Sequence, residues 1–489
     1  MSADVVVIGA GFGGLSTAIV LARLGLRVTL VEGEARPGGA LRSYTREGVD
    51  CPVGVHYFGS AAPGELLGDF LAVLGIRPAL KLRRLGTGGV IDRFFFDDEI
   101  FDLPSTAEKL EVSLAARFPD APGAVAFVMK ICRAAMASLR TDNMGAASPG
   151  YPMLPMTRTA AEVLAEMNLP QRLVDILALQ GFLIGVNLSA CPASFLMMAT
   201  ASLLMSAWEL GCTGAQMAEA LTERALAAGV DLIVGDPVDG ILVDGRRTSG
   251  VRLQSGRSMA TGTVVAAIHP KTMVGLLPPE ALPASYREGI GRLAETGGIL
   301  CVAALLDEKH HPAQDFNLFR VRGDPSRRLE GVYGQLRPSG VPGQTRLTVL
   351  VETSYAEWGR WHDTTTGHRG SEYRAEKARR AQQALGEVEE ATGPLHEPRI
   401  VDVWTPLTMR DWVGAPAGCT YGVKHSSRDG LDFLVLSRPP LPGLFLVGQN
   451  AIAPGLLGVS MGVLRVAAAI AGRQPLAELM ARARKEAGA

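Results

Sequence analysis

The chain begins with a short apolar run, which is followed by a longer segment of helical character. The run from Asp4 to Ile8 is rich in β-branched residues and ends at glycine, which is typical of a buried parallel strand. Leu15 to Leu24 is helix-like, and Gly25 ends it. A second apolar run follows from Arg27 to Glu32. This pattern predicts a β-α-β unit at the N-terminus.

Helical and strand patterns continue along the rest of the chain. Residues 91–103 predict a hairpin that turns at Asp97 and Asp98. Residues 105–225 predict mostly helices, with a proline- and glycine-rich break over residues 147–155. The other predicted elements are a mixed helical region (66–84), four short strands (231–234, 240–243, 250–253 and 263–267), a mixed region (276–395) with a charged helix (373–392), a strand (444–447) and a helix (458–471). Strands and helices mixed in this way predict an α/β fold.

One stretch has the polarity of a membrane-associated segment. Residues 177–208 contain no charged side chain, but Pro192 divides them and polar residues interrupt them. The apolar part after Pro192 is shorter than the roughly 20 residues that a membrane-spanning helix needs. We therefore expect a buried helix or the wall of an apolar cavity, with a membrane-dipping surface as the alternative.

Composition narrows the class of protein. The chain has 489 residues, of which 47% are hydrophobic and 20% charged, so it can bury a large core and is not disordered. Its net charge of -1 offers no basic excess for binding nucleic acid. The six cysteines form no CxxC pair, which favours a reducing cytoplasm over a disulfide framework. The first apolar run has no basic leader, so we expect no signal peptide.

The turn after the first predicted strand carries a phosphate-binding pattern. Gly9, Gly11 and Gly14 form GxGxxG between a strand and a helix. Gly9 permits the tight turn, Gly11 lets a pyrophosphate approach the helix N-terminus, and Gly14 allows close packing of helix on strand. Glu32 ends the second strand, where its carboxylate is placed to bind a ribose 2′-hydroxyl. The pattern predicts a dinucleotide site.

A second glycine pair indicates which dinucleotide is bound. Gly38 and Gly39 follow Glu32, and Arg42 supplies a cation for a phosphate or carboxylate. This extension resembles the FAD-binding signature of glutathione-reductase-type flavoproteins, especially the flavin amine oxidase and carotenoid desaturase superfamily. In that superfamily an Asp and a Gly beside the flavin ring follow, and Asp50 and Gly54 match them at a longer spacing.

Further motifs narrow the resemblance to one branch, the carotenoid (phytoene) desaturase and retinol saturase-like family. Residues 54–59 (GVHYFG) resemble its G-hydrophobic-H-Y-x-G segment. Near the C-terminus, PGLFLVGQ resembles its PGLYLxGQ turn, and Asn450 stands where the family usually has Asp. The other matching segments are residues 405–406 (TP), 418–422 (GCTYG), 454–458 (PGLLG) and 461–462 (MG). The resemblance covers about the whole chain.

The resemblance implies a Rossmann-type FAD-binding domain with an inserted α+β substrate domain. We expect the FAD-binding domain over residues 1–75, 215–275 and 396–489, and the substrate domain over residues 76–214 and 276–395. A helix that starts near Gly458 would aim its N-terminus at the flavin. The residues implied to hold FAD are Gly9, Gly11, Gly14, Glu32, Gly38, Gly39, Arg42, Gly54, Val238, Gly448, Gln449, Asn450, Leu457 and Gly458.

Candidates for acid–base chemistry are fewer. His56 and Tyr57 follow the segment expected beside the flavin, so they are the predicted catalytic residues, although a structural role for His56 is equally open. Cys51 and Cys419 are interpreted as small buried side chains. Lys424 and His425 are interpreted as exposed turn residues. His310 and His311 lack carboxylates at metal-like spacing, so no metal is predicted.

These features predict an FAD-dependent oxidoreductase that desaturates, saturates or isomerises an apolar polyene, isoprenoid or similar substrate. Its electron partner stays open among oxygen, a quinone and a reductant. We expect a cytoplasmic protein with a possible peripheral membrane contact. One alternative is a flavin amine oxidase, but its lysine near the flavin has no counterpart in Ile299 to Val302. The other is a non-enzymatic prenyl-lipid escort protein of the same fold, which would not require the FAD motifs together.

Overall fold

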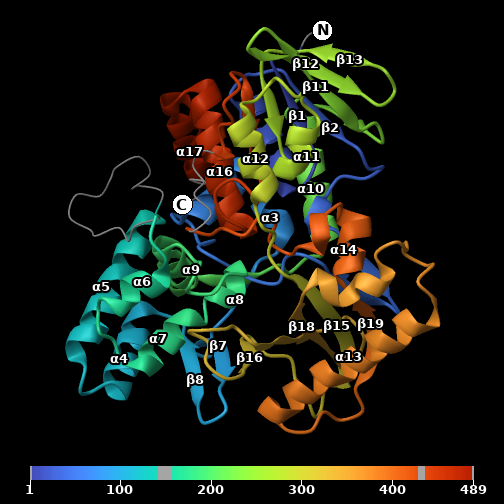
Figure 1. Ribbon diagram of the computed structural model, residues 1–489. Helices are drawn as coiled ribbons and strands as arrows, with labels where there is room; N and C mark the ends of the chain where they lie inside the picture. Colours follow the sequence, from blue (N-terminus) through green and yellow to red (C-terminus); the bar gives the residue numbers. More distant parts are fainter. Residues whose placement is uncertain (1–2, 141–156, 428–435, 487–489) are drawn as a thin grey trace.

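The structure is a computed structural model that describes residues 3–140, 157–427 and 436–486 (Figure 1). The break predicted over residues 147–155 lies outside these ranges. A parallel sheet forms one half of the molecule, and all of its neighbouring strands run in the same direction. Its strands in spatial order are β10 (Asp231–Val234), β2 (Val28–Glu32), β1 (Val5–Ile8), β14 (Val264–Ala266) and β20 (Leu444–Leu446). The α/β fold predicted from the sequence is confirmed.

Alternate residues of the parallel strands pack into two different cores. One core contains Val5, Val7 and Leu30, together with residues of a first group of helices. Val6 and Ile8 face a second core on the other side of the sheet. The first group is α1 (Phe12–Arg23), α2 (Leu66–Leu74), α10 (Gly214–Ala227), α16 (Gly455–Ala471) and α17 (Arg473–Glu486). The second core includes the antiparallel sheet of β11 (Val238–Asp244), β12 (Arg247–Leu253) and β13 (Ser258–Ala260), with α11 (Pro270–Gly275) and α12 (Ala284–Arg292).

A seven-stranded sheet forms the other half of the molecule, and α13 (Gly370–Thr392) packs on one of its faces (Figure 1). The strand order is β19 (Arg399–Trp404), β15 (Gly298–Asp307), β18 (Gln344–Thr353), β17 (Gly331–Pro338), β16 (Asn317–Val321), β7 (Val90–Phe95) and β8 (Ile100–Pro104). The hairpin predicted over residues 91–103 is confirmed as β7 and β8. The four strands from β15 to β18 were not distinguished within the region described as mixed.

The uncharged stretch folds into two helices that are packed inside the protein. They are α8 (Gly181–Ile184) and α9 (Ala193–Met205), and most side chains of α9 are buried. A helical layer surrounds them, made of α4 (Ala107–Arg117), α5 (Pro122–Ser138), α6 (Ala160–Ala165) and α7 (Gln171–Ala178). Among the described residues, no helix combines the length and the apolar character needed to cross a membrane.

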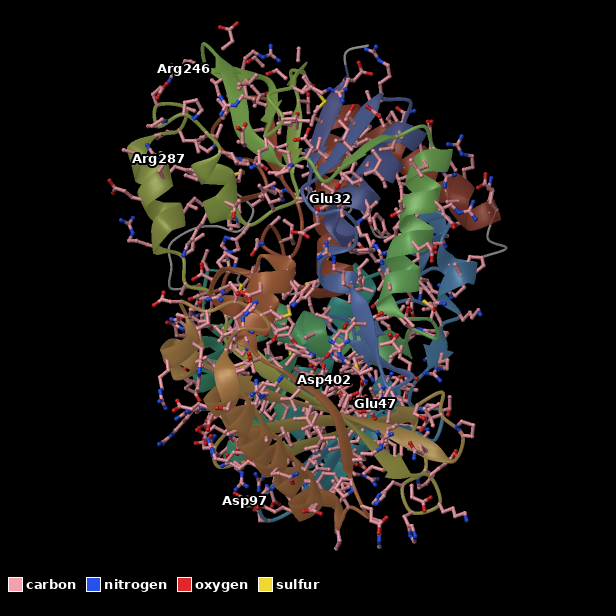
Figure 2. All side chains as sticks on the ribbon, turned by 90° about the vertical axis from the view of Figure 1, so that its right-hand side faces the viewer. Glu32, Glu47, Asp97, Arg246, Arg287 and Asp402 are labelled. Carbon is pink, nitrogen blue, oxygen red and sulfur yellow. The ribbon has the colours of Figure 1, made fainter. Side chains whose placement is uncertain are left out.

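Short elements join the two halves. They are η1 (Gly39–Leu41), β3 (Ser43–Arg46), β4 (Val49–Pro52), β5 (Phe58–Gly59), α3 (Arg77–Leu80), β6 (Arg83–Arg84), β9 (Ala207–Glu209), η3 (Tyr355–Trp361), α14 (Pro406–Val413) and η4 (Pro416–Gly418). Charges of both signs are spread over the molecule, with Arg246 and Arg287 at one end and Asp97 at the other (Figure 2).

Candidate active site

The glycine loop between β1 and α1 leaves backbone groups open. Gly9 has a positive φ of 95°, and a Cβ at Gly14 would overlap the carbonyl oxygen of Gly9. Gly14 therefore sets the close packing of α1 on the end of β1. A Cβ at Gly11 would meet only the Cα of Gly39, at 3.9 Å. No side chain caps the N-terminus of α1, so its first N–H groups are free to bind an anion.

The diglycine lies directly against this loop. Gly38 has a φ of 135°, and its N–H donates to the carbonyl of Ala10 at 2.8 Å. A Cβ at Gly39 would lie only 3.2 Å from the Cα of Gly11. Helix α1 and strand β2 separate the two glycine segments in the sequence. The fold places these segments side by side, where they form one continuous stretch of backbone without side chains.

Glu32 ends β2 beside the same loop (Figure 2). Its carboxylate accepts hydrogen bonds from the N–H groups of Ala10, at 2.7 Å, and Glu34, at 2.9 Å. Arg42 donates from its guanidinium to the carbonyls of Arg36 and Trp412, each at 2.8 Å. This arginine therefore holds α14 against the N-terminal segment.

The C-terminal motif packs on the first turn of α1. Gly448 has a φ of 101° and faces open space, while its Cα would lie 3.1 Å from a Cβ at Gly13. Asn450 is buried and accepts a hydrogen bond from the N–H of Val423 at 2.8 Å. Val238, at the start of β11, is also buried. Helix α16 begins at Gly455, three residues before the start predicted at Gly458.

These features fit FAD. The backbone at Gly11 and Gly448 is open in front, the N-terminus of α1 is uncapped, and an acid stands at the end of β2. A group with a pyrophosphate and a ribose requires this set of donors and acceptors.

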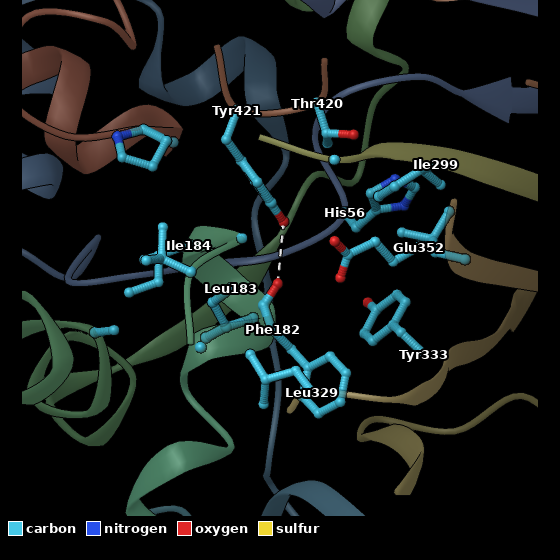
Figure 3. Close-up of a pocket in the computed structure, with 18 of the residues that line it drawn as sticks. His56, Phe182, Leu183, Ile184, Ile299, Leu329, Tyr333, Glu352, Thr420 and Tyr421 are labelled. Atoms are coloured by element: carbon cyan, nitrogen blue, oxygen red, sulfur yellow. Dashed lines mark hydrogen bonds between the residues drawn. The ribbon is translucent and has the colours of Figure 1, made fainter. Parts of the chain in front are cut away.

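A large cavity of about 990 Å³ lies between the flavin motifs and the seven-stranded sheet. One side is formed by residues 54–59 and 452–459, together with Gln449, and includes Leu457 and Gly458. The side built by α8 and α9 is apolar, with Phe182, Leu183 and Ile184 from α8 (Figure 3). Charged residues also line the cavity, namely Arg322, Arg327, Arg328, Glu330, Glu352, Glu357, Glu387 and Lys424. The hydroxyl of Tyr421 donates to the carbonyl of Phe182 at 3.4 Å, which links two walls. The uncharged stretch is therefore the wall of a cavity, as one of its two interpretations predicted.

The seven-stranded sheet contributes a row of side chains to this cavity. Cross-strand pairing places Phe319, Tyr333 and Leu350 in one row, and the rings of Phe319 and Tyr333 are 5.0 Å apart. One step along the strands, Glu352 pairs with Ile299, and both line the cavity. The sequence analysis missed Tyr333 and Glu352, because nothing in their local sequence shows which strands they join.

His56 lines the cavity and retains an unused polar atom. Its Nδ1 is buried and has no hydrogen-bond partner among the described residues. Burial, together with the positive charges of Arg346 and Arg337, lowers the pKa of His56 to about 4. The imidazole is therefore neutral near pH 7.

Tyr57 takes part in a buried polar network. Its hydroxyl donates to the carboxylate of Asp92 at 3.1 Å, and its ring stacks on Tyr333 at 5.9 Å. Asn317 donates to the same carboxylate at 2.8 Å, and Arg337 donates to Asn317 at 2.6 Å. Burial and the neighbouring Asp92 carboxylate raise the pKa of Tyr57 well above its ordinary value. The hydroxyl therefore keeps its proton.

The remaining candidates have diverse surroundings. Cys51 and Cys419 are both buried, and burial raises the pKa of each thiol to about 11. Lys424 lines the cavity. His425 is buried beside Phe195, so the interpretation as an exposed turn residue was wrong. Burial lowers its pKa to about 4.

Known proteins resemble this chain in sequence and in fold. Residues 12–465 match the family model of flavin-containing amine oxidoreductases. Human all-trans-retinol 13,14-reductase is 22% identical over 97% of this chain and 87% of its own length. Hydroxyneurosporene desaturase of Cereibacter sphaeroides is 30% identical over 57% of this chain and 59% of its own length. Among solved structures, a double mutant of putrescine oxidase superposes with a TM-score of 0.64 at 16% identity, over 96% of this chain and 98% of its own.

The fold and the site define a dinucleotide-binding oxidoreductase with a large, mainly apolar cavity. The chain belongs to the family of flavin-containing amine oxidoreductases. The predictions of FAD as cofactor and of an oxidoreductase are confirmed, as is the resemblance to retinol saturases and carotenoid desaturases. The roles of individual residues and the domain boundaries stay predictions.

Proposed function

We propose that the protein exchanges hydride between FAD and a carbon–carbon bond of an apolar polyene or isoprenoid, with desaturation, saturation or isomerisation as the outcome. The observation that carries this proposal is the cavity of about 990 Å³, which runs from the flavin motifs into apolar walls built by α8, α9 and the sheet. Apolar walls with flexible methionines, such as Met198 and Met461, suit a long hydrocarbon. The related retinol reductase and carotenoid desaturases are named after substrates of this kind.

Bound FAD would supply the hydride chemistry, and this chain would bind and enclose it. Gly9, Gly11 and Gly14, with Gly38 and Gly39, would hold the pyrophosphate by their backbone, and Glu32 would accept from the ribose. Arg42, Gly54 and Val238, with Gly448, Gln449, Asn450, Leu457 and Gly458, stay the other proposed FAD residues. His56 would line the cavity with a neutral imidazole, while Tyr57 would steady β7 through its hydrogen bond to Asp92.

An amine oxidase is the main competing function, because putrescine oxidase shares the fold. The structure gives two observations on this point. Strand β15 carries no lysine, and the cavity walls are mostly apolar. A cationic amine would lose hydration against these apolar walls and would need a carboxylate such as Glu352 to compensate, so binding of putrescine is the measurement that separates the two functions.

A substrate panel separates these functions. The flavin-loaded protein would be mixed anaerobically with all-trans-retinol, phytoene, zeta-carotene, putrescine and cyclohexylamine, in both the oxidised and the reduced state. We expect one of the polyenes to change the flavin absorbance and to yield a product that differs by two hydrogens or by double-bond geometry. Reaction with an amine alone would refute the proposal, and purified protein without flavin bands would favour an escort protein.

The electron partner and the cellular location are proposed only in outline. With a reacting polyene known, oxygen, a soluble quinone and a chemical reductant can each be tested for turnover. A peripheral membrane contact is proposed because such substrates partition into lipid. Co-sedimentation with vesicles of neutral phospholipid would test it.

A further inference from the structure

A carboxylate stands on the substrate side of the cavity. Glu352 lies on β18 and pairs with Ile299 of β15, two residues after Leu350, which pairs with Tyr333. Side chains two residues apart on a strand share a face, so Glu352 belongs to the same cavity wall as Tyr333 and Leu350. Figure 3 shows its carboxylate directed into the cavity between the labelled His56 and Tyr333.

The backbone beside Glu352 makes room for this carboxylate. A Cβ at Gly297 would lie 2.5 Å from Oε1 of Glu352, so a larger residue at that position would displace the carboxylate. Within the described parts of the chain, no hydrogen bond or ion pair is recorded for it, although the side chain is accessible from the cavity. By contrast, the buried Glu209 is paired with Arg83 and Arg337. Glu352 is exposed to the cavity, so its carboxylate is accessible to a substrate.

The electrostatic surroundings favour proton exchange at this group. The side chain is exposed to the cavity, and the partial burial of its carboxyl in the cavity wall raises the pKa of Glu352 above its ordinary value. Lys424 and Arg328 oppose this rise, and the neighbouring Glu357 adds to it. A raised pKa increases the share of the carboxyl that holds its proton at a given pH, which favours proton donation to a substrate. The other two candidates are less suited. His56 has a pKa of about 4, and the hydroxyl of Tyr57 already donates to Asp92.

We propose that Glu352 is a catalytic residue that exchanges a proton with the substrate carbon next to the one that exchanges hydride. This role rests on the proposed function. In saturation, one carbon of the double bond takes hydride, with two electrons, from reduced flavin. Its neighbour takes the proton of the Glu352 carboxyl, so two C–H bonds form and the flavin is oxidised. The carboxylate then recovers a proton from water. Desaturation is the same step in reverse, with oxidised flavin as the hydride acceptor.

The first test compares Glu352→Gln, Glu352→Asp and the control Glu280→Gln. Glu280 is an exposed glutamate between α11 and α12 that does not line the cavity. With the polyene that reacts with wild type, Glu352→Gln should keep the flavin spectrum and melting temperature, and should slow flavin oxidation or reduction about 10²–10⁴-fold at saturating substrate. Glu352→Asp should recover part of the rate, and Glu280→Gln should match wild type.

The pH profile identifies the proton that is exchanged. A rate that requires the protonated acid falls as pH rises through its pKa, as in saturation, whereas a rate that requires the carboxylate falls as pH decreases. Wild type should show one of these limbs, and Glu352→Gln should lack it. A wild-type rate and limb in Glu352→Gln would overturn the role of Glu352 while the proposed function stood. If no polyene reacted with wild type, the proposed function would fail and this role with it.

A second measurement does not depend on turnover. Infrared difference spectra of the flavin-loaded protein, titrated with acid and base, should show a protonated carboxyl band that persists above the pH at which ordinary glutamates ionise. Asp92 should give a band of its own, because burial raises its pKa to about 7, so the comparison is made in the Asp92→Asn background. In that background Glu352→Gln should remove a further band and Glu280→Gln should not. Spectra that Glu352→Gln leaves unchanged there would overturn the proposal. Tight binding of putrescine to wild type, lost in Glu352→Gln, would also overturn it and assign the carboxylate to ammonium binding.

Discussion

The two sides of the cavity are built from different parts of the polypeptide. On the flavin side the backbone forms the surface, at Gly9, Gly11, Gly38, Gly39 and Gly448, where a side chain would clash, be strained or fill open space. On the substrate side, side chains form the surface, and they come from strands that are distant in sequence but adjacent in the seven-stranded sheet. The shape of the flavin side is therefore set by backbone geometry, whereas the chemistry of the substrate side is set by particular side chains.

This difference has a consequence for mutation. On the flavin side an added methyl group meets rigid backbone at Gly9 and Gly14, or enters open space beside the backbone at Gly11 and Gly448. We therefore expect steep losses of fold or of cofactor. On the substrate side a changed side chain alters chemistry or local polarity, and the fold has room to adjust. The four predictions below test that contrast.

The largest effect is expected for Gly14→Ala. The new Cβ would overlap the carbonyl oxygen of Gly9, and neither α1 nor β1 can move without disturbing the sheet. We expect a loss of about 3 kcal/mol or more in unfolding free energy, and protein purified without flavin. Gly386→Ala is the matched control, because that helical glycine of α13 has no atom near its Cβ position, and it should gain about 1 kcal/mol. Equal flavin content in both variants would refute steric control of the flavin side.

The next effect concerns Glu32→Ala. Its carboxylate accepts from Ala10 and Glu34, and would also accept from the ribose. Loss of a hydrogen bond to a charged group costs roughly 1.5–3 kcal/mol, so FAD should bind about ten- to hundredfold more weakly. Fluorescence titration of the apoprotein with FAD measures this change. Glu34→Ala, which removes the exposed neighbour, should leave the affinity unaltered; an equal loss there would point to general charge instead.

The same contrast explains what the sequence could predict. All five strands of the parallel sheet and the glycine loops were predicted, because each depends on a few consecutive residues whose spacing has a direct steric meaning. The part of the cavity wall that the seven-stranded sheet provides was not predicted. Glu352 and Tyr333 gain their position only from pairing between β15, β17 and β18, and His425 is buried by Phe195, which lies far from it in sequence. Local patterns do not contain such pairings.

His56 and Tyr57 lie where the flavin side and the substrate side of the cavity meet. Their variants should differ, one in reaction rate and the other in stability. His56→Ala removes the unpartnered Nδ1, so we expect a normal flavin spectrum and about a tenfold slower reaction with the polyene, which corresponds to one hydrogen bond. Tyr57→Phe removes the donor to Asp92 and should lower the melting temperature with little change in rate. Rapid mixing and thermal melts decide this. A larger rate loss in Tyr57→Phe than in His56→Ala would assign the proton transfer to Tyr57.

The last effect depends on pH and is expected deep behind the substrate wall, at Asp92. This carboxyl is buried and accepts hydrogen bonds from Asn317 and Tyr57. Burial raises its pKa to about 7, against the opposing effect of these two donors and of Arg337. The folded state then binds a proton that the unfolded chain has released, so stability falls as pH rises from about 4 to about 7. Below this window the contribution is fully present, and above it the contribution is lost.

Asp92→Asn should remove this dependence, because asparagine resembles the protonated acid and can serve both neighbours. Buried histidines such as His56 and His425, whose pKa values are lowered to about 4, tilt stability the opposite way, since the unfolded chain takes up protons there first. Wild type and Asp92→Asn share these histidines, so the difference between their melting temperatures reports on Asp92 alone. We expect the melting temperatures of wild type and Asp92→Asn to be nearly equal at pH 4, to diverge in favour of the variant up to pH 7, and to run parallel above it. A constant difference across this range would show that Asp92 is ionised throughout, and would place a charge, not a neutral acid, behind the substrate wall.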